Sequence, residues 1–178
     1  MIVCYNLDIW YMLTKLSSDF AATTTELLAT IASFKEADIN TIPFEGSWTA
    51  GQVGEHIYKS ISAISHSLQG AVKKTDRDPG EKIKAIGDLF LNFDFKMKSP
   101  DFIQPSELPH DKTLLLRCLT LITSEVSEQI ATQDLSATCL QSALPGFGDL
   151  TRLELCYFIV FHTQRHIHQL KKILNATA

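Results

Sequence analysis

The sequence predicts an all-α protein built as a bundle of four long helices, and three observations support this fold class. Four long segments carry apolar residues at helical spacing, clusters of proline and glycine separate them, and none has the alternating pattern typical of strands. The chain of 178 residues is about one domain's worth of sequence, and its 45% of hydrophobic residues suffices for one core. We therefore expect a single domain over residues 1–178.

The first two helices are predicted over about residues 7–35 and 49–72, separated by the loop 40–46. Thr49 and Gln52 stand three residues apart, which is the form of a capping box. In this motif each side chain satisfies a free backbone amide at the start of a helix. The motif therefore predicts where the second helix begins.

Residues 81–109 are the least regular stretch of the chain. Residues 82–95 have the pattern of a short helix, and Pro100, Pro105 and Pro109 then predict an extended crossover. This connection is long for a helical bundle. We expect it to cover one end of the bundle.

The last two long helices are predicted over about residues 112–132 and 151–174, with a loop at 144–149 between them. Thr151 and Glu154 form a second capping box at the start of the fourth long helix.

Charge and composition exclude several classes of protein. The net charge is −4 with acidic and basic residues mixed, whereas binding to a nucleic-acid backbone needs a concentrated basic face, so we expect no nucleic-acid partner. The most apolar stretch, 153–161, is too short to span a bilayer, and the N-terminus does not have the pattern of a signal peptide, so no membrane is expected. The four cysteines include no Cys-x-x-Cys pair, which is typical of a reducing compartment. We expect a cytoplasmic protein in which Cys118 and Cys156 are small buried apolar residues.

The fourth long helix carries the most informative polar residues. His162 and His166 lie on a stripe of apolar residues spaced by three or four, at positions where the pattern calls for apolar side chains. Because they are four residues apart, both imidazoles can reach one metal ion at about 2.0–2.1 Å from each ring nitrogen. Two buried imidazoles without partners are costly, and either a metal ion or a compensating polar partner would account for them.

His56 is the candidate third ligand. It shares a stripe of small residues on the second helix with Ser60, Ala63 and Ser67, which leaves room for an ion or a ligand. The sequence alone does not require that this helix faces the fourth long helix. Three neutral histidines with one open coordination position are what a catalytic divalent site requires.

No fourth ligand is apparent in the sequence. At about 100° per residue, Glu55 points about 100° away from His56, and His168 points about 160° away from His166. We interpret Glu55, His66, His110 and His168 as mainly solvated or loop residues.

Three residues are candidates for supporting the site. Gln169, three residues after His166, could orient that ligand, and a solvent-facing position is an equal alternative. Arg165 could meet an acidic group of a substrate, although an exposed helix charge is the favoured interpretation. Trp48 could line the mouth of the site, although packing at the helix start, as in a hydrophobic staple, is favoured.

The ordered motifs resemble the DinB-like superfamily, the DinB/YfiT-like proteins. They are WTAGQVGEHI at 48–57, GDLTRLE at 148–154, and the histidine motif HxxRHxxQL at 162–170. Each motif is short, but their order spans nearly the whole chain and is more specific than any one of them.

The resemblance implies a four-helix bundle in up-down-down-up order with a long crossover, and a nickel or zinc site on His56, His162 and His166. Characterised relatives include thiol-dependent S-transferases and a maleylpyruvate isomerase. The resemblance therefore implies a metal-dependent enzyme with a small-molecule substrate and a low-molecular-weight thiol as co-substrate, acting in detoxification or stress response.

Three functions stay open at this point. The first is the metal-dependent enzyme, either an S-transferase or a hydrolase that uses water activated by the metal. The second is a non-catalytic bundle that holds a metal or an apolar ligand. The third is an interaction scaffold, for example a homodimer, in which the histidines satisfy one another through hydrogen bonds.

Overall fold

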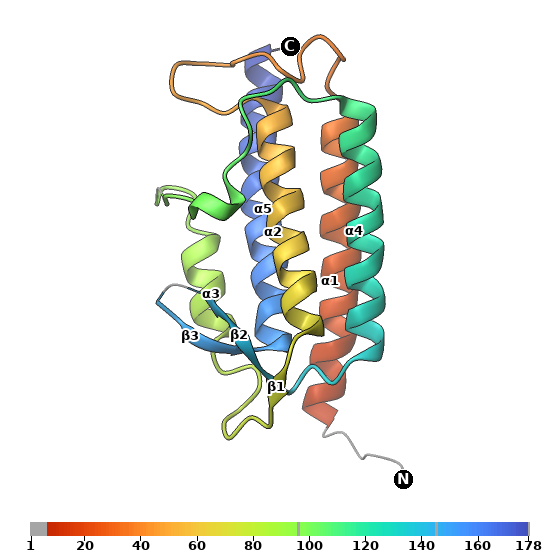
Figure 1. The fold of residues 1–178 in the computed structure, drawn as a ribbon, viewed down its shortest axis with the longest axis vertical. Coiled ribbons are helices and arrows are strands. Elements are labelled where there is room, and N and C mark those ends of the chain that lie inside the picture. The colour runs from red at the N-terminus through yellow and green to blue at the C-terminus, as the bar shows by residue number, and fades with distance from the viewer. Residues whose placement is uncertain (1–6, 96, 145, 178) are drawn as a thin grey trace.

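The computed structural model describes residues 7–95, 97–144 and 146–177. Four long helices stand side by side in it (Figure 1): α1 (Leu7–Ala32), α2 (Ala50–Gln69), α4 (Lys112–Thr132) and α5 (Arg152–Thr177). Both α1 and α2 pack against both α4 and α5, so the four helices close a ring around one core. This confirms the prediction of a predominantly helical protein.

Apolar side chains from all four long helices fill this core. The fully buried ones include Leu16, Leu27, Ile31, Ile57, Ile61, Leu68, Leu119 and Leu155. Complete burial of such a side chain contributes about 1.5–3 kcal/mol, so the inward stripe of each helix is what holds the bundle together.

Both predicted capping boxes are confirmed. The Thr49 hydroxyl accepts from the Gln52 amide at 3.1 Å, and the Gln52 side-chain oxygen accepts from the Thr49 amide at 3.0 Å. Thr151 and Glu154 exchange the equivalent bonds at 3.1 and 3.0 Å. Local sequence therefore fixes where α2 and α5 begin.

The prediction of an all-α fold is wrong in one respect, because a small antiparallel sheet lies at one end of the bundle. Its strands, in the order β1-β2-β3, are β1 (Val72–Lys73), β2 (Thr138–Leu144) and β3 (Gly148–Thr151). The predicted loop 144–149 is partly strand, since Leu144 pairs with Gly148. Two strands are very short, and β3 runs from two exposed residues to two buried ones instead of alternating. These strands therefore lack the period-2 pattern that would have revealed them.

Helix ends differ from the predictions by a few residues. The first helix ends at Ala32, and α2 ends at Gln69, because residues 72–73 pair with β2 instead. The short helix α3 (Ile83–Phe90) lies within the predicted range 82–95, and a short 3-10 helix, η1 (Asp101–Ile103), follows it. None of the described helices combines the length and the apolar character needed to cross a membrane.

The crossover from α3 to α4 runs along the side of α2 before it reaches the bundle end (Figure 1). The Gln104 backbone carbonyl accepts from the Lys59 ammonium at 2.7 Å, and the Ser106 backbone carbonyl accepts from the Gln52 side chain at 3.2 Å. The connection that we expected to cover one end of the bundle is thus also hydrogen-bonded along the side of α2. We call residues 103–110 of this connection the strap.

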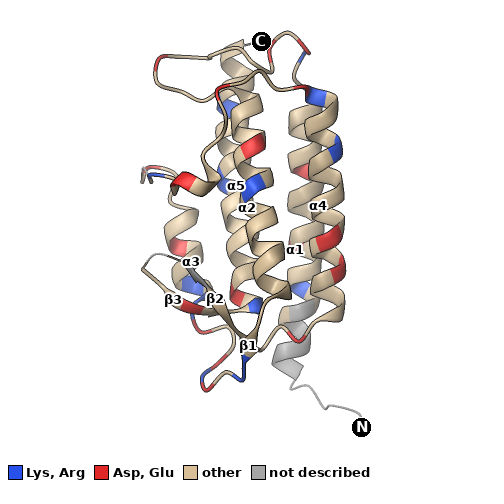
Figure 2. Cartoon of the chain, in the orientation of Figure 1, with Lys and Arg blue, Asp and Glu red and all other residues tan. Residues whose placement is uncertain are grey.

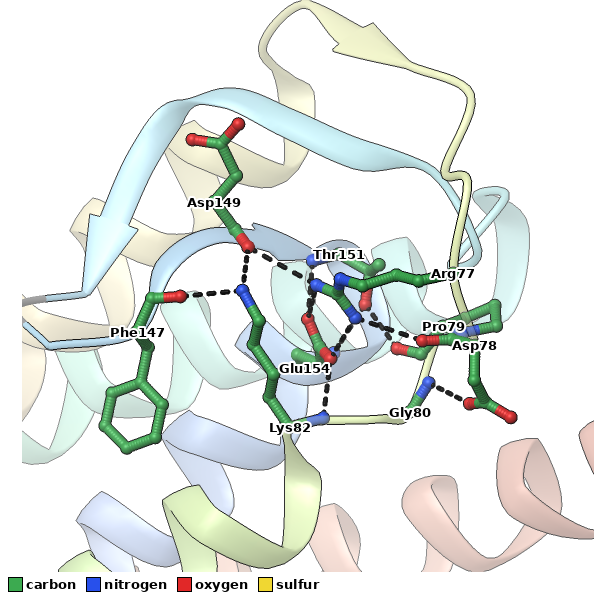
Figure 3. Close-up of polar contacts among 9 residues, drawn as sticks. All are labelled: Arg77, Asp78, Pro79, Gly80, Lys82, Phe147, Asp149, Thr151 and Glu154. Atoms are coloured by element: carbon green, nitrogen blue, oxygen red, sulfur yellow. Dashed lines mark hydrogen bonds and ion pairs between the residues drawn. The ribbon is translucent and has the colours of Figure 1, made fainter.

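Acidic and basic residues are interspersed along the described helices and loops (Figure 2). The main exception to their surface placement is the Glu154 carboxylate, which is 0% exposed at the start of α5. It accepts from both terminal nitrogens of Arg77 at 2.6 Å, from the Lys82 amide at 2.9 Å and from the Thr151 amide at 3.0 Å (Figure 3). Hydrogen bonding to Glu154 raises the pKa of Arg77.

The same cluster ties three segments together. The Lys82 ammonium donates to the carbonyls of Phe147 and Asp149 at 2.6 and 2.8 Å, and the Thr151 hydroxyl donates to the Pro79 carbonyl at 2.7 Å (Figure 3). The loop before α3, the β2–β3 hairpin and the start of α5 are therefore locked to one another.

Candidate metal centre

The packing of α2 against α5 brings the three predicted histidines together. His56 comes from α2, and His162 and His166 come from successive turns of α5. His56 and His162 are 1% and 5% exposed, and His166 is partly buried beside them. Their possible ligand atoms lie within 4.8 Å of one another.

The Nε2 atoms of the three rings converge. His162 Nε2 lies 3.2 Å from His56 Nε2 and 3.2 Å from His166 Nε2. Three nitrogens held about 2.0–2.1 Å from one ion at tetrahedral angles stand about 3.3 Å apart. The observed spacing therefore fits the donor set of a single divalent ion.

Hydrogen bonds on the far side of two rings fix their tautomers. His56 Nδ1 lies 2.9 Å from the Ile103 carbonyl oxygen, which only accepts, so Nδ1 carries the hydrogen. His166 Nδ1 lies 2.8 Å from the Gln169 side-chain oxygen and carries its hydrogen for the same reason. In the neutral rings both Nε2 atoms are then lone-pair donors that face the centre.

His162 makes the cluster unsatisfied as it stands. Its Nδ1 is buried and has no hydrogen-bond partner in the described part of the chain. Its single hydrogen can lie on Nε2, where it serves one neighbouring ring well, or on Nδ1, where it meets no acceptor. Hydrogen bonds among the rings therefore leave an Nε2 lone pair of the cluster without a donor. An ion would accept all three Nε2 lone pairs, with the His162 hydrogen then on Nδ1.

Burial keeps these imidazoles neutral. It lowers the pKa of His56, and it lowers the pKa of His166 to about 3, with a further lowering by His56. Burial and the two neighbouring rings hold the pKa of His162 well below its usual range. Neutral imidazole is the form that binds a metal.

Aromatic rings surround the histidines. The Trp48 ring centroid lies 5.1 Å from that of His56, and the rings of Phe158 and Phe90 lie 5.3 and 5.9 Å from that of His162. No acidic side chain bonds any of the three histidines within the described ranges. The donor set is therefore uncharged and shielded by apolar surface.

The supporting residues proposed from sequence have different positions. The Gln169 side-chain oxygen accepts from His166 Nδ1, and the Trp48 ring lies beside that of His56. Arg165 instead donates to the backbone carbonyls of Asn92, at 2.7 Å, and Phe95, so it holds the segment after α3. Its expected interpretation as an exposed helix charge is wrong, because it is partly buried.

The prediction that Glu55 is a mainly solvated or loop residue is wrong, whereas His110 is a loop residue as predicted. Glu55 Oε2 accepts from the Ser106 amide at 2.7 Å, from its hydroxyl at 3.0 Å and from His110 Nε2 at 2.8 Å. Burial acts to raise the pKa of Glu55, but hydrogen bonds from Lys59, His110 and Ser106 outweigh it and lower the value to about 2. Glu55 therefore clamps the strap that carries the Ile103 carbonyl.

The remaining two histidines lie outside the centre. His66 is exposed, as expected. His168 is partly buried and stacks on Phe93, with ring centroids 4.3 Å apart.

A helical bundle with three converging imidazole donors defines a class of candidate metal proteins. The family model of the DinB superfamily matches residues 19–170, so the chain belongs to the DinB superfamily. This confirms the resemblance carried by the sequence motifs, and the match includes all three histidines. No curated protein and no solved structure matched the chain.

Proposed function

We propose that the protein is a metal-dependent enzyme in which His56, His162 and His166 hold one divalent ion, nickel or zinc. The convergence of three Nε2 atoms, with neighbouring pairs 3.2 Å apart, carries this proposal. The reaction proposed is the transfer of a low-molecular-weight thiol to a small electrophile, in detoxification or stress response. Membership of the DinB superfamily supports this choice because thiol-dependent S-transferases are among the relatives that the sequence resembles.

The chain's own residues prepare the donors. The Ile103 carbonyl and the Gln169 side chain hold His56 and His166 in the tautomer that presents Nε2. When bound, a divalent ion would supply Lewis-acid chemistry that lowers the pKa of a thiol or of water. The rings of Trp48, Phe90 and Phe158 limit the access of bulk water to the donors.

The finer details of the fold belong to the same proposal. The up-down-down-up order of the family is supported by the course of the chain in Figure 1, where α2 and α4 run opposite to α5. We also propose a cytoplasmic location and a homodimeric state. Cell fractionation tests the first, and light scattering of the purified protein tests the second.

The first test is the metal content of untagged protein purified without added metal or immobilised nickel. We expect about one equivalent of nickel or zinc in the wild type and almost none in His162→Ala, because two imidazoles hold a divalent ion far more weakly than three. His66→Ala is the matched control, since His66 is an exposed histidine on the same helix as His56. Wild-type protein that takes up no nickel or zinc on titration would refute the proposal and favour the scaffold alternative.

The second test concerns catalysis by the metal-loaded protein. Low-molecular-weight thiols are mixed with an aryl chloride. The released chloride is measured as the readout for formation of the carbon–sulfur bond. Thiol-dependent turnover that His162→Ala abolishes supports the S-transferase. Turnover of an activated ester without thiol favours the hydrolase, and bound metal without either activity favours the non-catalytic bundle.

A further inference from the structure

A surface cavity lies near the three-histidine centre. It is a cavity of about 380 Å³ between the connection from α1 to α2 and the end of the strap that leads into α4. Its lining includes the apolar side chains of Ile42, Trp48, Leu108 and Pro109. This volume is at the small end of the range for ligand sites in proteins.

The cavity and the histidine centre share a wall. Trp48 lines the cavity, and its ring lies 5.1 Å from the ring of His56, measured between centroids. Gln52 also lines it and comes four residues before His56 on α2. Four residues are about one helical turn, a rise of about 5.4–6 Å, so the cavity lies about one turn of α2 from the centre.

Most polar side chains of the wall are committed to internal bonds, and the exception is His110, whose buried Nδ1 has no hydrogen-bond partner among the described residues. Asn40 exchanges two hydrogen bonds with the backbone of His110, at 2.8 and 2.9 Å. Thr49 and Gln52 cap each other, and the Gln52 amide also donates to the Ser106 carbonyl. What remains available for a ligand is chiefly apolar surface.

The rim of the cavity leaves large apolar side chains in water. Ile42 is 66% exposed and Leu108 is 73% exposed, on the two connections that face each other across the opening. Covering them with an apolar ligand would release about 25 cal/mol for each square ångström removed from water. The indole of Trp48 offers a flat face for an aromatic ring or a cation.

The charge of the lining is one-sided. Among the described lining residues there is no Lys or Arg, and Glu107 is the one carboxylate. Glu107 is exposed and forms no ion pair within the described ranges. An anionic ligand would therefore meet the like charge of Glu107 and no Lys or Arg, while the one imidazole of the lining, His110, is already paired with Glu55.

We propose that this cavity binds an aromatic group, uncharged or positively charged, of the substrate that reacts at the three-histidine centre. The inference rests on the proposed function and narrows its substrate class. It disfavours electrophiles whose aromatic end carries a carboxylate.

The test compares three ligands of matched size and different charge: naphthylmethanol, naphthylmethylamine and naphthylacetate. They are titrated into protein stripped of metal, so that binding to an ion does not contribute. The readout is the indole N–H resonance of Trp48. The chain has two tryptophans, and a Trp10→Phe variant identifies which of the two indole resonances belongs to Trp48.

We expect the alcohol and the amine to shift the Trp48 resonance. The carboxylate should bind about threefold more weakly than the amine, because an exposed charge pair is worth up to about 1 kcal/mol. Glu107→Lys should reverse this order, whereas Glu128→Lys, the same charge change on the exposed face of α4, should preserve it. Equal or tighter binding of the carboxylate to the wild type, or no shift with any ligand, would overturn the proposal.

A kinetic measurement separates this inference from the proposed function. In the metal-loaded enzyme, Glu107→Lys should change KM for charged aryl electrophiles about threefold, whereas Glu128→Lys should leave this KM unchanged. If the protein binds metal and turns over thiols but KM stays constant, the cavity assignment alone is wrong. If the ligands bind as expected but the chain takes up no metal, the proposed function is wrong while the cavity remains a binding site.

Discussion

Two buried polar clusters lie in the same bundle, and they differ in how their polar atoms are satisfied. At the start of α5, the two carboxylate oxygens of Glu154 receive four hydrogen bonds, two of them from the oppositely charged Arg77 (Figure 3). At the centre formed by α2 and α5, three neutral imidazoles turn lone pairs toward one another, and His162 Nδ1 has no partner among the described residues.

The difference separates a structural cluster from a candidate site. A buried charge is stable only when its partners are complete, and the Glu154 cluster is complete without any ligand. A buried group of converging lone pairs is incomplete until something accepts them. Removing a partner from the Glu154 cluster should therefore lower the free energy of unfolding most. Adding an ion to the three-histidine centre should raise it most.

The largest effect is expected from Arg77→Met. This change leaves the Glu154 carboxylate buried without its counter-charge, so the free energy of unfolding in urea should fall by about 3–5 kcal/mol. Lys84→Met is the control, because the pair between Lys84 and Asp88 is exposed and worth well below 1 kcal/mol. A fall of less than 1 kcal/mol in Arg77→Met would mean that the cluster does not depend on this charge.

The next effect is the stabilisation by metal. Zinc at a free concentration one hundred times its dissociation constant should raise the free energy of unfolding of the wild type by about 2.7 kcal/mol. His162→Leu should show no such gain. Without metal, this variant should stay within about 1 kcal/mol of the wild type, because an apolar side chain replaces an imidazole that lacks a full set of partners.

A smaller effect is expected from Gln169→Ala, measured as zinc affinity in competition with a chelator. Loss of the oxygen that orients His166 should weaken binding by about 10-fold to 100-fold. Gln164→Ala, on the same helix, removes a side chain that bonds Thr23 instead and should leave the affinity unchanged. Equal affinities in both variants would show that Gln169 has no role in the centre.

The smallest effect is expected from Glu55→Gln. The strap loses hydrogen bonds to a charged acceptor, so the free energy of unfolding should fall by about 1.5 kcal/mol. Zinc affinity should fall by no more than about tenfold, because the Ile103 carbonyl is held less firmly against His56. Glu36→Gln serves as the control, since that side chain is exposed. Unchanged stability would mean that the strap is held mainly by its other contacts.

Local patterns made part of this structure predictable. The capping boxes at Thr49 and Thr151, and the shared face of His162 and His166, depend on residues three or four apart, which is the distance that helical geometry controls. His56 was placed opposite them only through the family resemblance, because 106 residues separate His56 from His162 along the chain.

The missed features depend on distant partners or on the backbone. The Ile103 carbonyl has no side-chain signature, and it meets His56 across 47 residues of sequence. Glu55 was misassigned, and its contact with His110 was missed, because the segment that carries His110 has no periodic pattern. The short strands were not predicted because their own sequence has no strand pattern. Residues 72–73 form a strand through their pairing with β2.

The distance along the chain between His56 and His162 also has a consequence for how the protein unfolds. An ion held by both would join positions 106 residues apart and would act as a reversible cross-link across more than half of the sequence. Restricting an unfolded chain in this way removes conformational entropy that grows with the length of the closed loop. Metal supply in the cell would then set how cooperatively the two halves of the chain unfold, in addition to whether the site is filled.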